Sequence, residues 1–238
     1  PLNPNQLLIS IKKVLENNSI IKNKLKTDYL NSFNKLSSEI NSNNNFFDWI
    51  EIYKKIVNWE ISLEKNSDDE YDQILISQKK EANKNFSKYI IENYKQWINN
   101  ENHRPTMSFD LLKKRIFPRI NSKPIFFILI DNFRYDQWKA IEDYISNYFF
   151  IKSDDPYFSI LPTTTEYSRN SIFSGLSPLE MSNVESKLWE DKLNGLNNNE
   201  FEFINNNFKR NNLLVKHSYT KIVSHEDGVK FVKKFSDL

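Results

Sequence analysis

Two short segments of the chain carry oxygen-bearing side chains where proteins often place reactive groups. Asp131 directly follows the apolar run at residues 125–130, and Thr165 ends a Pro-Thr-Thr-Thr sequence that begins at Pro162. A carboxylate oxygen is a good ligand for zinc, manganese or magnesium. A threonine hydroxyl at the start of a helix, with its pKa lowered by a metal, is a competent nucleophile towards phosphorus. The two residue types therefore suit metal-assisted chemistry at a phosphate group.

Both residues also have purely structural explanations. Asp131 could cap the next helix or pair with Arg134, and a hydroxyl in the threonine run could cap the helix that follows it. The residues alone leave these alternatives open.

Three further side chains are weaker candidates for contacting a phosphate or for supporting such a site. Asn132 and Arg134 follow Asp131, and Asn170 lies about one helical turn beyond Thr165. Asn132 could instead cap a helix, and Arg134 could form an ion pair with Asp136 or with a helix carboxylate.

The histidines offer no second set of metal ligands. His103, His217 and His225 are widely separated, and none has another metal-binding residue at a typical ligand spacing. We therefore expect surface histidines, with His217 in an apparent strand at residues 215–219.

The elements that would position Asp131 and Thr165 suggest an α/β domain. The run at residues 125–130 is apolar without alternation, which indicates a strand buried on both faces of a parallel sheet. Such sheets hold functional residues beyond the carboxyl ends of their strands, where Asp131 would lie. Residues 148–151 and 157–161 also suggest strands, whereas residues 136–144 and 165–173 suggest helices, the second closed near Gly175.

The region before these elements should be helical. The chain's three glycines all lie at or after position 175, and apolar residues recur at helical spacing from residue 7 to residue 97. Polar clusters at residues 41–45 and 66–69 would end and cap helices. We therefore predict three long helices between about residues 18 and 100, followed by a connector with Pro105, Pro118 and Pro124.

Composition excludes some function classes. The chain has 238 residues, with 33 basic and 31 acidic side chains and a formal charge of +2, so bulk charge does not favour nucleic acid or membrane as a partner. Without cysteine, disulfides, thiolate metal sites and cysteine nucleophiles are excluded. No stretch approaches the roughly 20 apolar residues of a membrane span, so we expect a soluble protein.

Three motifs together resemble a known family. Residues 130–139 read IDNFRYDQWK, residues 162–165 read PTTT, and residues 174–178 read SGLSP. This order is similar to the start of an alkaline phosphatase superfamily domain of the PglZ type. It most resembles the PorX-like response regulators of Bacteroidetes, which join a receiver, a helical bundle and a PglZ domain. Residues 1–6 are similar to the segment after the receiver's switch lysine, so most of a receiver would precede this chain.

The resemblance implies a fold and a division into domains. We expect residues 1–17 to be the last receiver helix and linker, residues 18–105 a three-helix bundle, and residues 106–238 the first part of the PglZ domain. This predicts an α/β chain: a helical bundle followed by a partial alkaline-phosphatase-like domain with a mainly parallel sheet covered by helices.

The resemblance also implies site residues and cofactors. It makes Thr165 the catalytic nucleophile and makes Asp131 and Thr165 ligands of two divalent metal ions, expected to be zinc. Gly175 lies ten positions after Thr165, as in related phosphodiesterases, and this register favours Thr165 over Thr163 and Thr164. The family's downstream metal ligands have no match before Leu238, so residues 1–238 alone should be inactive.

By the same resemblance, the parent protein would be a cytoplasmic phosphatase or phosphodiesterase that controls type IX secretion. Its expected partners are a sensor kinase acting through the receiver, a second copy in a phosphorylation-linked homodimer, and a phosphate ester, possibly a nucleotide or oligonucleotide, with no membrane. The alternative is a non-enzymatic signalling adaptor with a vestigial phosphatase fold and a helical bundle that docks partner proteins.

Overall fold

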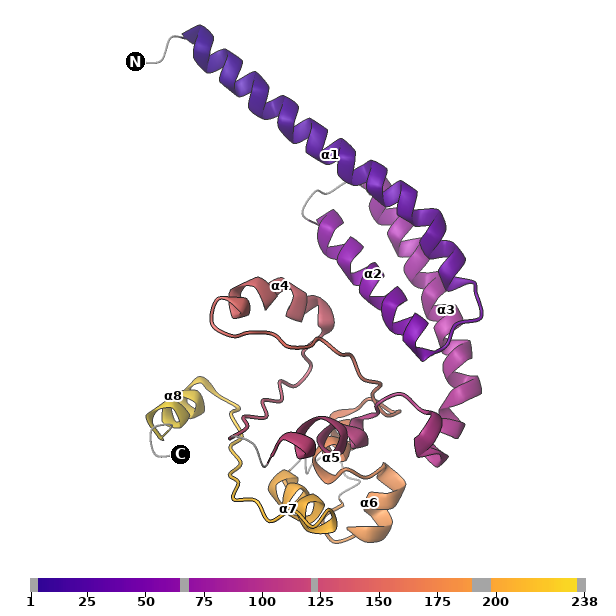
Figure 1. Ribbon diagram of the computed structural model, residues 1–238, viewed down its shortest axis with the longest axis vertical. Coiled ribbons are helices and arrows are strands. Elements are labelled where there is room, and N and C mark those ends of the chain that lie inside the picture. Colours follow the sequence, from indigo (N-terminus) through magenta and orange to yellow (C-terminus); the bar gives the residue numbers. More distant parts are fainter. Residues whose placement is uncertain (1–3, 65–68, 121–123, 190–197, 235–238) are drawn as a thin grey trace. The chain divides into compact units, whose positions relative to one another are not determined.

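The computed structural model describes residues 4–64, 69–120, 124–189 and 198–234, and it divides into two compact units. Unit 1 contains residues 1–104 and 130–156, and unit 2 contains residues 105–129 and 157–238. Regular structure in the described ranges is helical (Figure 1), apart from one isolated parallel bridge between Met107 and Phe158. The chain crosses between the units at residues 104–105, 129–130 and 156–157.

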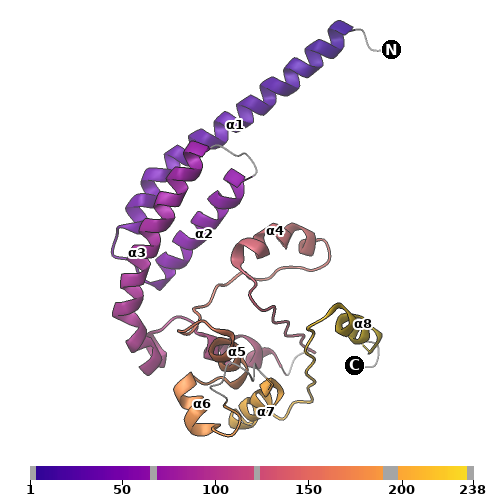
Figure 2. The same cartoon turned by 180° about the vertical axis from the view of Figure 1, so that it is seen from behind.

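Unit 1 is built on three long helices, α1 (Pro4–Ile40), α2 (Phe46–Glu64) and α3 (Asp69–Asn99), which pack side by side (Figures 1 and 2). They lie where the apolar spacing of the sequence placed helices. The N-terminal part of α1 extends beyond the other two helices in both views. The bundle core consists of Leu36, Ile40, Trp49, Ile52, Ile56, Leu63, Leu75 and Ala82.

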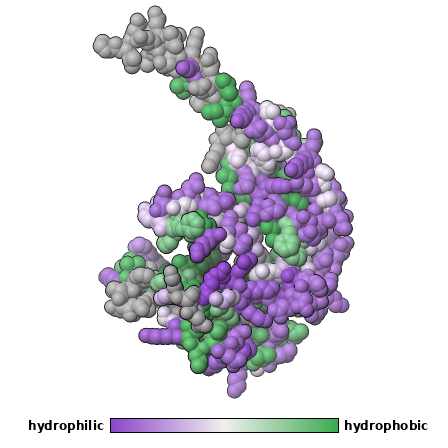
Figure 3. Space-filling model, viewed as in Figure 1, coloured by the Kyte–Doolittle hydropathy of each residue, from purple (hydrophilic) through white to green (hydrophobic). Residues whose placement is uncertain are grey.

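Polar contacts fix how the three helices meet. The Lys55 ammonium on α2 lies 2.7 Å from both carboxylate oxygens of Glu39 on α1. The buried Gln78 amide on α3 donates to the Ser37 hydroxyl at 3.2 Å. Hydrophilic residues cover most of the bundle face visible in Figure 3, as expected for helices that bury one apolar stripe.

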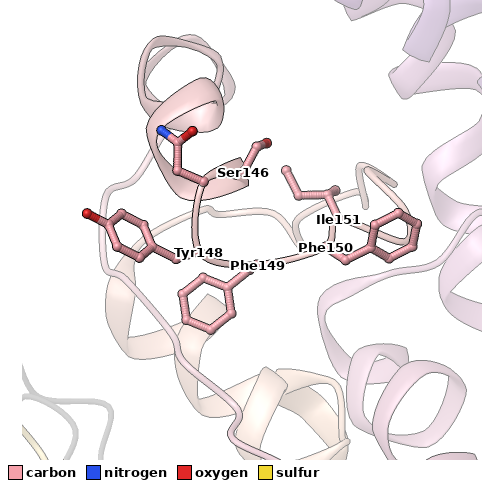
Figure 4. A pocket seen from close by; sticks show the side chains of 6 residues that line it. Ser146, Tyr148, Phe149, Phe150 and Ile151 are labelled. Carbon is pink, nitrogen blue, oxygen red and sulfur yellow. The ribbon is translucent and has the colours of Figure 1, made fainter.

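Unit 1 also contains η1 (Glu101–His103) and α4 (Tyr135–Ser146), which confirms the helix expected near residues 136–144. α4 packs against α2, where the rings of Tyr53 and Tyr135 lie 5.8 Å apart between centroids. The Tyr135 hydroxyl donates to Asp154 at 3.0 Å, tying the segment after α4 to the start of that helix. Figure 4 shows the side chains of Tyr148, Phe149 and Phe150 diverging from the turn after α4.

The described residues of unit 2 form short helical turns and four α-helices. The turns are η2 (Ser108–Asp110), η3 (Leu112–Ile116) and η4 (Phe117–Arg119). The helices are α5 (Thr165–Ser174), α6 (Pro178–Val184), α7 (Glu200–Arg210) and α8 (His225–Lys234). Phe173, Met181 and Phe203 form a buried cluster among α5, α6 and α7. α5 also packs against η2.

The prediction of a mainly parallel sheet, and with it of an α/β fold, is wrong. Within the described residues no β-strand forms at 125–130, 148–151, 157–161 or 215–219. Phe126 and Ile128 are 63% and 78% exposed rather than buried on two sheet faces. The apolar run satisfies the local preference for a strand, but a strand also needs a neighbour that pairs with its backbone. Apart from the single bridge between Met107 and Phe158, the described residues provide no such ladder.

The division into a receiver helix, a bundle and a PglZ domain stays a prediction. α1 runs without a break across residues 17 and 18, where we placed the first boundary. Unit 2 begins at Pro105, next to the second boundary, although residues 130–156 belong to unit 1. None of the helices within the described ranges combines the length and hydrophobicity that a membrane span requires.

Gly175 closes α5 as the sequence predicted. It is the C-cap of the helix, with φ +67° in the left-handed region that disfavours side chains. A β-carbon there would lie 2.8 Å from Nδ2 and 3.0 Å from Oδ1 of Asn207. Asn207 is itself buried and donates from Nδ2 to the Phe173 carbonyl oxygen at 3.0 Å. Glycine at position 175 therefore permits the close approach of α7 to the end of α5.

Gly175→Ala should destabilise unit 2. The left-handed conformation costs an alanine about 1–2 kcal/mol, and displacing Asn207 adds to that cost. We expect a lower urea midpoint for unfolding, followed by circular dichroism. The matched control is Gly228→Ala in α8, where the nearest atom to a new β-carbon is Ile222 Cγ2 at 3.9 Å. Because alanine favours a helix, Gly228→Ala should be neutral or stabilising by up to about 1 kcal/mol. Equal midpoints for the two variants would contradict this account of Gly175.

Candidate functional site

Thr165 is the first residue of α5 and is half-buried. Thr164 is the N-cap residue, but its side chain makes no capping hydrogen bond. Its carbonyl oxygen instead accepts from the backbone N–H groups of Tyr167 at 3.1 Å and Ser168 at 2.8 Å, which begins the helix. The structure therefore does not support helix capping as the role of the Thr164 hydroxyl, and it places Thr165 at the positive end of the helix dipole.

The middle of α5 is tied to α7 by a buried charge. Arg169 Nε lies 2.5 Å from Glu200 Oε1, with the two side chains 15% and 2% exposed. These two atoms make a close ionic contact without an aligned hydrogen bond between them. The other oxygen of Glu200 accepts a hydrogen bond from the Tyr219 hydroxyl and lies 3.7 Å from Lys221 Nζ. Glu200 thus joins α5, α7 and the segment after α7.

The surroundings of Tyr219 raise the pKa of its phenol. Burial raises its pKa first, and the hydrogen bond to Glu200 and the charge of that carboxylate raise it further, because all three favour the neutral phenol. The ring of Tyr219 also packs edge-on against Phe173 of α5, with centroids 5.9 Å apart.

Asn170, which we named as a weak site candidate, lies in the interior of unit 2. Its side chain is 5% exposed, and Oδ1 has no hydrogen-bond partner among the described residues. The neighbouring Ser171 hydroxyl is also buried without a hydrogen-bond partner among them. α5 therefore buries polar atoms as well as apolar ones along the turns that follow Thr165.

Asp131 lies in unit 1, in an exposed turn before α4 rather than at the end of a strand. Asn132 follows it with φ +54°, a left-handed conformation that asparagine tolerates better than most residues. The turn places the Asp131 carboxylate at the surface of unit 1. Thr165 and Asn170 belong to unit 2.

Arg134 forms the ion pair that the sequence left as an alternative. Its Nε and Nη2 donate to the two oxygens of Asp136 at 3.0 and 2.7 Å. This hydrogen bonding lowers the pKa of Asp136 and raises the pKa of Arg134. The backbone N–H of Arg134 donates to Gln137 Oε1 at 2.9 Å, which helps to start α4. The guanidinium is therefore paired with the Asp136 carboxylate.

The histidines do not form a metal site within the described ranges. His217 Nε2 lies 2.6 Å from Asn205 Oδ1, Nδ1 lies 2.9 Å from the Val215 carbonyl oxygen, and its ring contacts Phe208. No group of three or more His, Cys, Asp or Glu side chains there is arranged to hold a metal ion.

Two protein-family models match the chain, one in its N-terminal part and one in its C-terminal part. Residues 19–98 match the PorX response regulator linker domain, and residues 111–234 match the BREX system PglZ alkaline phosphatase-like domain. The chain belongs to the PorX-like response regulators with a PglZ domain. The second match covers about half of the chain and includes both Asp131 and Thr165. A search of curated proteins finds no match.

The PglZ match covers residues from both units, because Asp131 and α4 lie in unit 1. Sequence reasoning missed the contact of Arg169 with Glu200 and the hydrogen bond from Tyr219 to Glu200. A signal was partly present, since Arg169 lies four residues after Thr165 and so on the same helix face. Nothing in the sequence indicated Glu200, which looks like an ordinary acidic residue in the first turn of a helix.

Tyr219→Phe should show how much the hydrogen bond from Tyr219 to Glu200 contributes to the stability of the fold. Losing a hydrogen bond to a charged acceptor should cost about 1.5–3 kcal/mol of stability at neutral pH. The phenol pKa is higher in the folded state than in the unfolded chain, where it is 10.0. The hydrogen bond therefore contributes its whole stabilisation below pH 10, and this stabilisation is lost as pH rises through the folded pKa. Urea unfolding from about pH 7 to about pH 11 should therefore show a stability gap that narrows above pH 10.

Tyr144→Phe, at an exposed tyrosine of α4, is the control and should show no gap at any pH. A gap between wild type and Tyr219→Phe that stays constant to high pH would contradict the assignment of the bond to Glu200.

Proposed function

We propose that this chain belongs to a response regulator that hydrolyses phosphate esters, with Thr165 as the nucleophile and Asp131 as a metal ligand. The family matches support a response regulator with an alkaline phosphatase-like domain, and such a domain suggests hydrolase activity in the parent protein. The observation that carries the finer proposal is the place of Thr165, as the first residue of α5 behind an N-cap whose side chain makes no capping hydrogen bond.

The donor chemistry fits divalent metal ions. Asp131 offers an exposed carboxylate, and Thr165 offers a half-buried hydroxyl. Both are oxygen donors of the kind that zinc, manganese and magnesium accept. In the proposed enzyme these residues would be ligands of two metal ions, expected to be zinc, which would supply Lewis acidity at the phosphoryl group. Among the described residues, Asp131 and Thr165 are the only metal ligands that we assign.

The proposed reaction passes through a covalent intermediate. The Thr165 oxygen attacks phosphorus and loses its proton, the bond from phosphorus to the ester oxygen breaks, and the leaving oxygen takes up a proton. Water then attacks the phosphothreonine and returns the proton to Thr165 as phosphate departs. The positive end of the α5 dipole would favour the negative phosphoryl oxygens at this place.

The regulatory part of the proposal follows from the linker match. A PorX response regulator linker domain at residues 19–98 supports a response regulator. We propose that a sensor kinase acts through its receiver and that type IX secretion is the process controlled. We propose that receiver phosphorylation promotes a homodimer. We further propose that the substrate is a phosphate mono- or diester, possibly a nucleotide or oligonucleotide.

Thr165→Ala should abolish turnover of aryl phosphate monoesters and diesters by the intact response regulator supplied with zinc. Removing the nucleophile should lower kcat by about three orders of magnitude or more. Thr165→Ser keeps a hydroxyl and should retain measurable activity. Steady-state kinetics with a chromogenic phosphate would check both expectations.

Thr163→Ala is the matched control, because Thr163 is an exposed threonine two positions before Thr165 and should not attack phosphorus. Asp131→Ala should lower the content of bound zinc, whereas Asp143→Ala, at an exposed carboxylate of α4, should not. Wild-type kcat in Thr165→Ala would contradict the proposal. Absence of turnover in the wild-type protein with zinc would favour the alternative of a signalling adaptor.

A further inference from the structure

Two ion pairs with buried carboxylates lie beside α5. Arg169, in the middle of α5, pairs with Glu200 at the first position of α7. Arg210, at the last position of α7, pairs with Glu185 and also donates to the Ser174 carbonyl oxygen at the end of α5. The Glu200 and Glu185 side chains are 2% and 3% exposed. α7 therefore holds α5 by charged groups at two levels along its length.

The contact at Glu200 is the one closer to Thr165. Thr165 and Arg169 are four residues apart on α5, so they lie on one face of the helix about one turn apart. Helical side chains lean towards the N-terminus of their helix, which directs Arg169 towards the turn that begins with Thr165. The contacts of Asn207 and Arg210 lie at the opposite end, at Phe173 and Ser174.

Stability alone gives a weak reason for a charge cluster in this place. Taking a carboxylate and a guanidinium out of water opposes folding, and a well-packed apolar pair often stabilises a fold equally well. An ion pair does, however, fix the direction of two side chains, and here Tyr219 and Lys221 approach the second oxygen of the same carboxylate. Arg169, Tyr219 and Lys221 all lie next to the Glu200 carboxylate and fix its position. The ion pair with Glu200 in turn fixes the position of Arg169.

We propose that Glu200 is a positioning residue for the phosphoryl-transfer site, which fixes the first turn of α5, and with it the Thr165 hydroxyl, by holding Arg169. This inference rests on the proposed function of Thr165. The orientation of Thr165 would then depend on the Glu200 carboxylate on α7, which need not touch the substrate.

The test compares Glu200→Gln with Glu202→Gln in the intact response regulator. Both residues lie in α7, but Glu202 is exposed and should behave as wild type. Glu200→Gln keeps the shape of the side chain and removes its charge. We expect kcat on an aryl phosphate to fall about 10- to 100-fold, the range typical of lost supporting contacts, with KM within about twofold of wild type.

Asn207→Ala separates positioning from lost stability. It removes the hydrogen bond to the Phe173 carbonyl oxygen and should lower the unfolding midpoint, but it should leave kcat close to wild type because it loosens the far end of α5. An equal fall of kcat in Asn207→Ala and Glu200→Gln would overturn a specific role for Glu200.

Hydrogen exchange gives a readout that does not depend on activity. The N–H groups of Tyr167 and Ser168 close the first turn of α5 on Thr164. They should exchange faster in Glu200→Gln than in Glu202→Gln, while the amides of α7 keep their wild-type protection. Unchanged exchange in this turn would contradict the proposal even if kcat falls.

Arg169→Lys provides a second route in case Glu200→Gln fails to fold. Lysine keeps the positive charge but loses the planar guanidinium, so it should reproduce the loss of kcat. The double variant should be no slower than the slower single variant, because both changes break one contact. Loss of activity in Thr165→Ala with wild-type kcat in Arg169→Lys and Glu200→Gln would overturn this inference alone. Activity in Thr165→Ala would instead overturn the proposed function and this inference with it.

Discussion

The polar attachment of α5 to α7 is the constraint on which the candidate nucleophile depends. A helix of ten residues is not stable in water by its own hydrogen bonds, so its position must come from its neighbours. Phe173 supplies an apolar anchor, while Asn207 and Arg210 bind the last carbonyl groups of the helix. Glu200 holds the helix nearer its beginning through Arg169. Together these contacts hold α5 in unit 2, and the contact of Glu200 with Arg169 is the one nearest to Thr165.

Local signals were enough to predict helices in the bundle and at α4 and α5, whereas α6 and α7 were not predicted. Gly175 adopts the left-handed conformation that its place after α5 requires. The long apolar stripes at helical spacing likewise placed α1, α2 and α3. These features depend on residues within a few positions of one another, which is why the sequence alone predicts them well.

The sheet could not be predicted in the same way, because strand pairing depends on residues far apart in the chain. The run at 125–130 has the composition of a buried strand, yet its side chains are largely exposed and no described segment pairs with it. The Arg169–Glu200 contact was missed for a similar reason, since it joins α5 to α7, and α6 lies between these two helices in the chain. By contrast, Arg134 and Asp136 are close in sequence, and their pairing was one of the alternatives named.

The central claim is that Thr165 carries the phosphoryl group during turnover, and trapping that intermediate tests it most directly. The intact response regulator, loaded with zinc, would be mixed with an aryl phosphate, quenched in acid during steady-state turnover, digested and analysed by mass spectrometry. The account predicts a phosphoryl group on Thr165 in the wild-type protein and none at this position in Thr165→Ala. Sustained turnover with no phosphothreonine at position 165, or with the phosphoryl group on another residue, would contradict it.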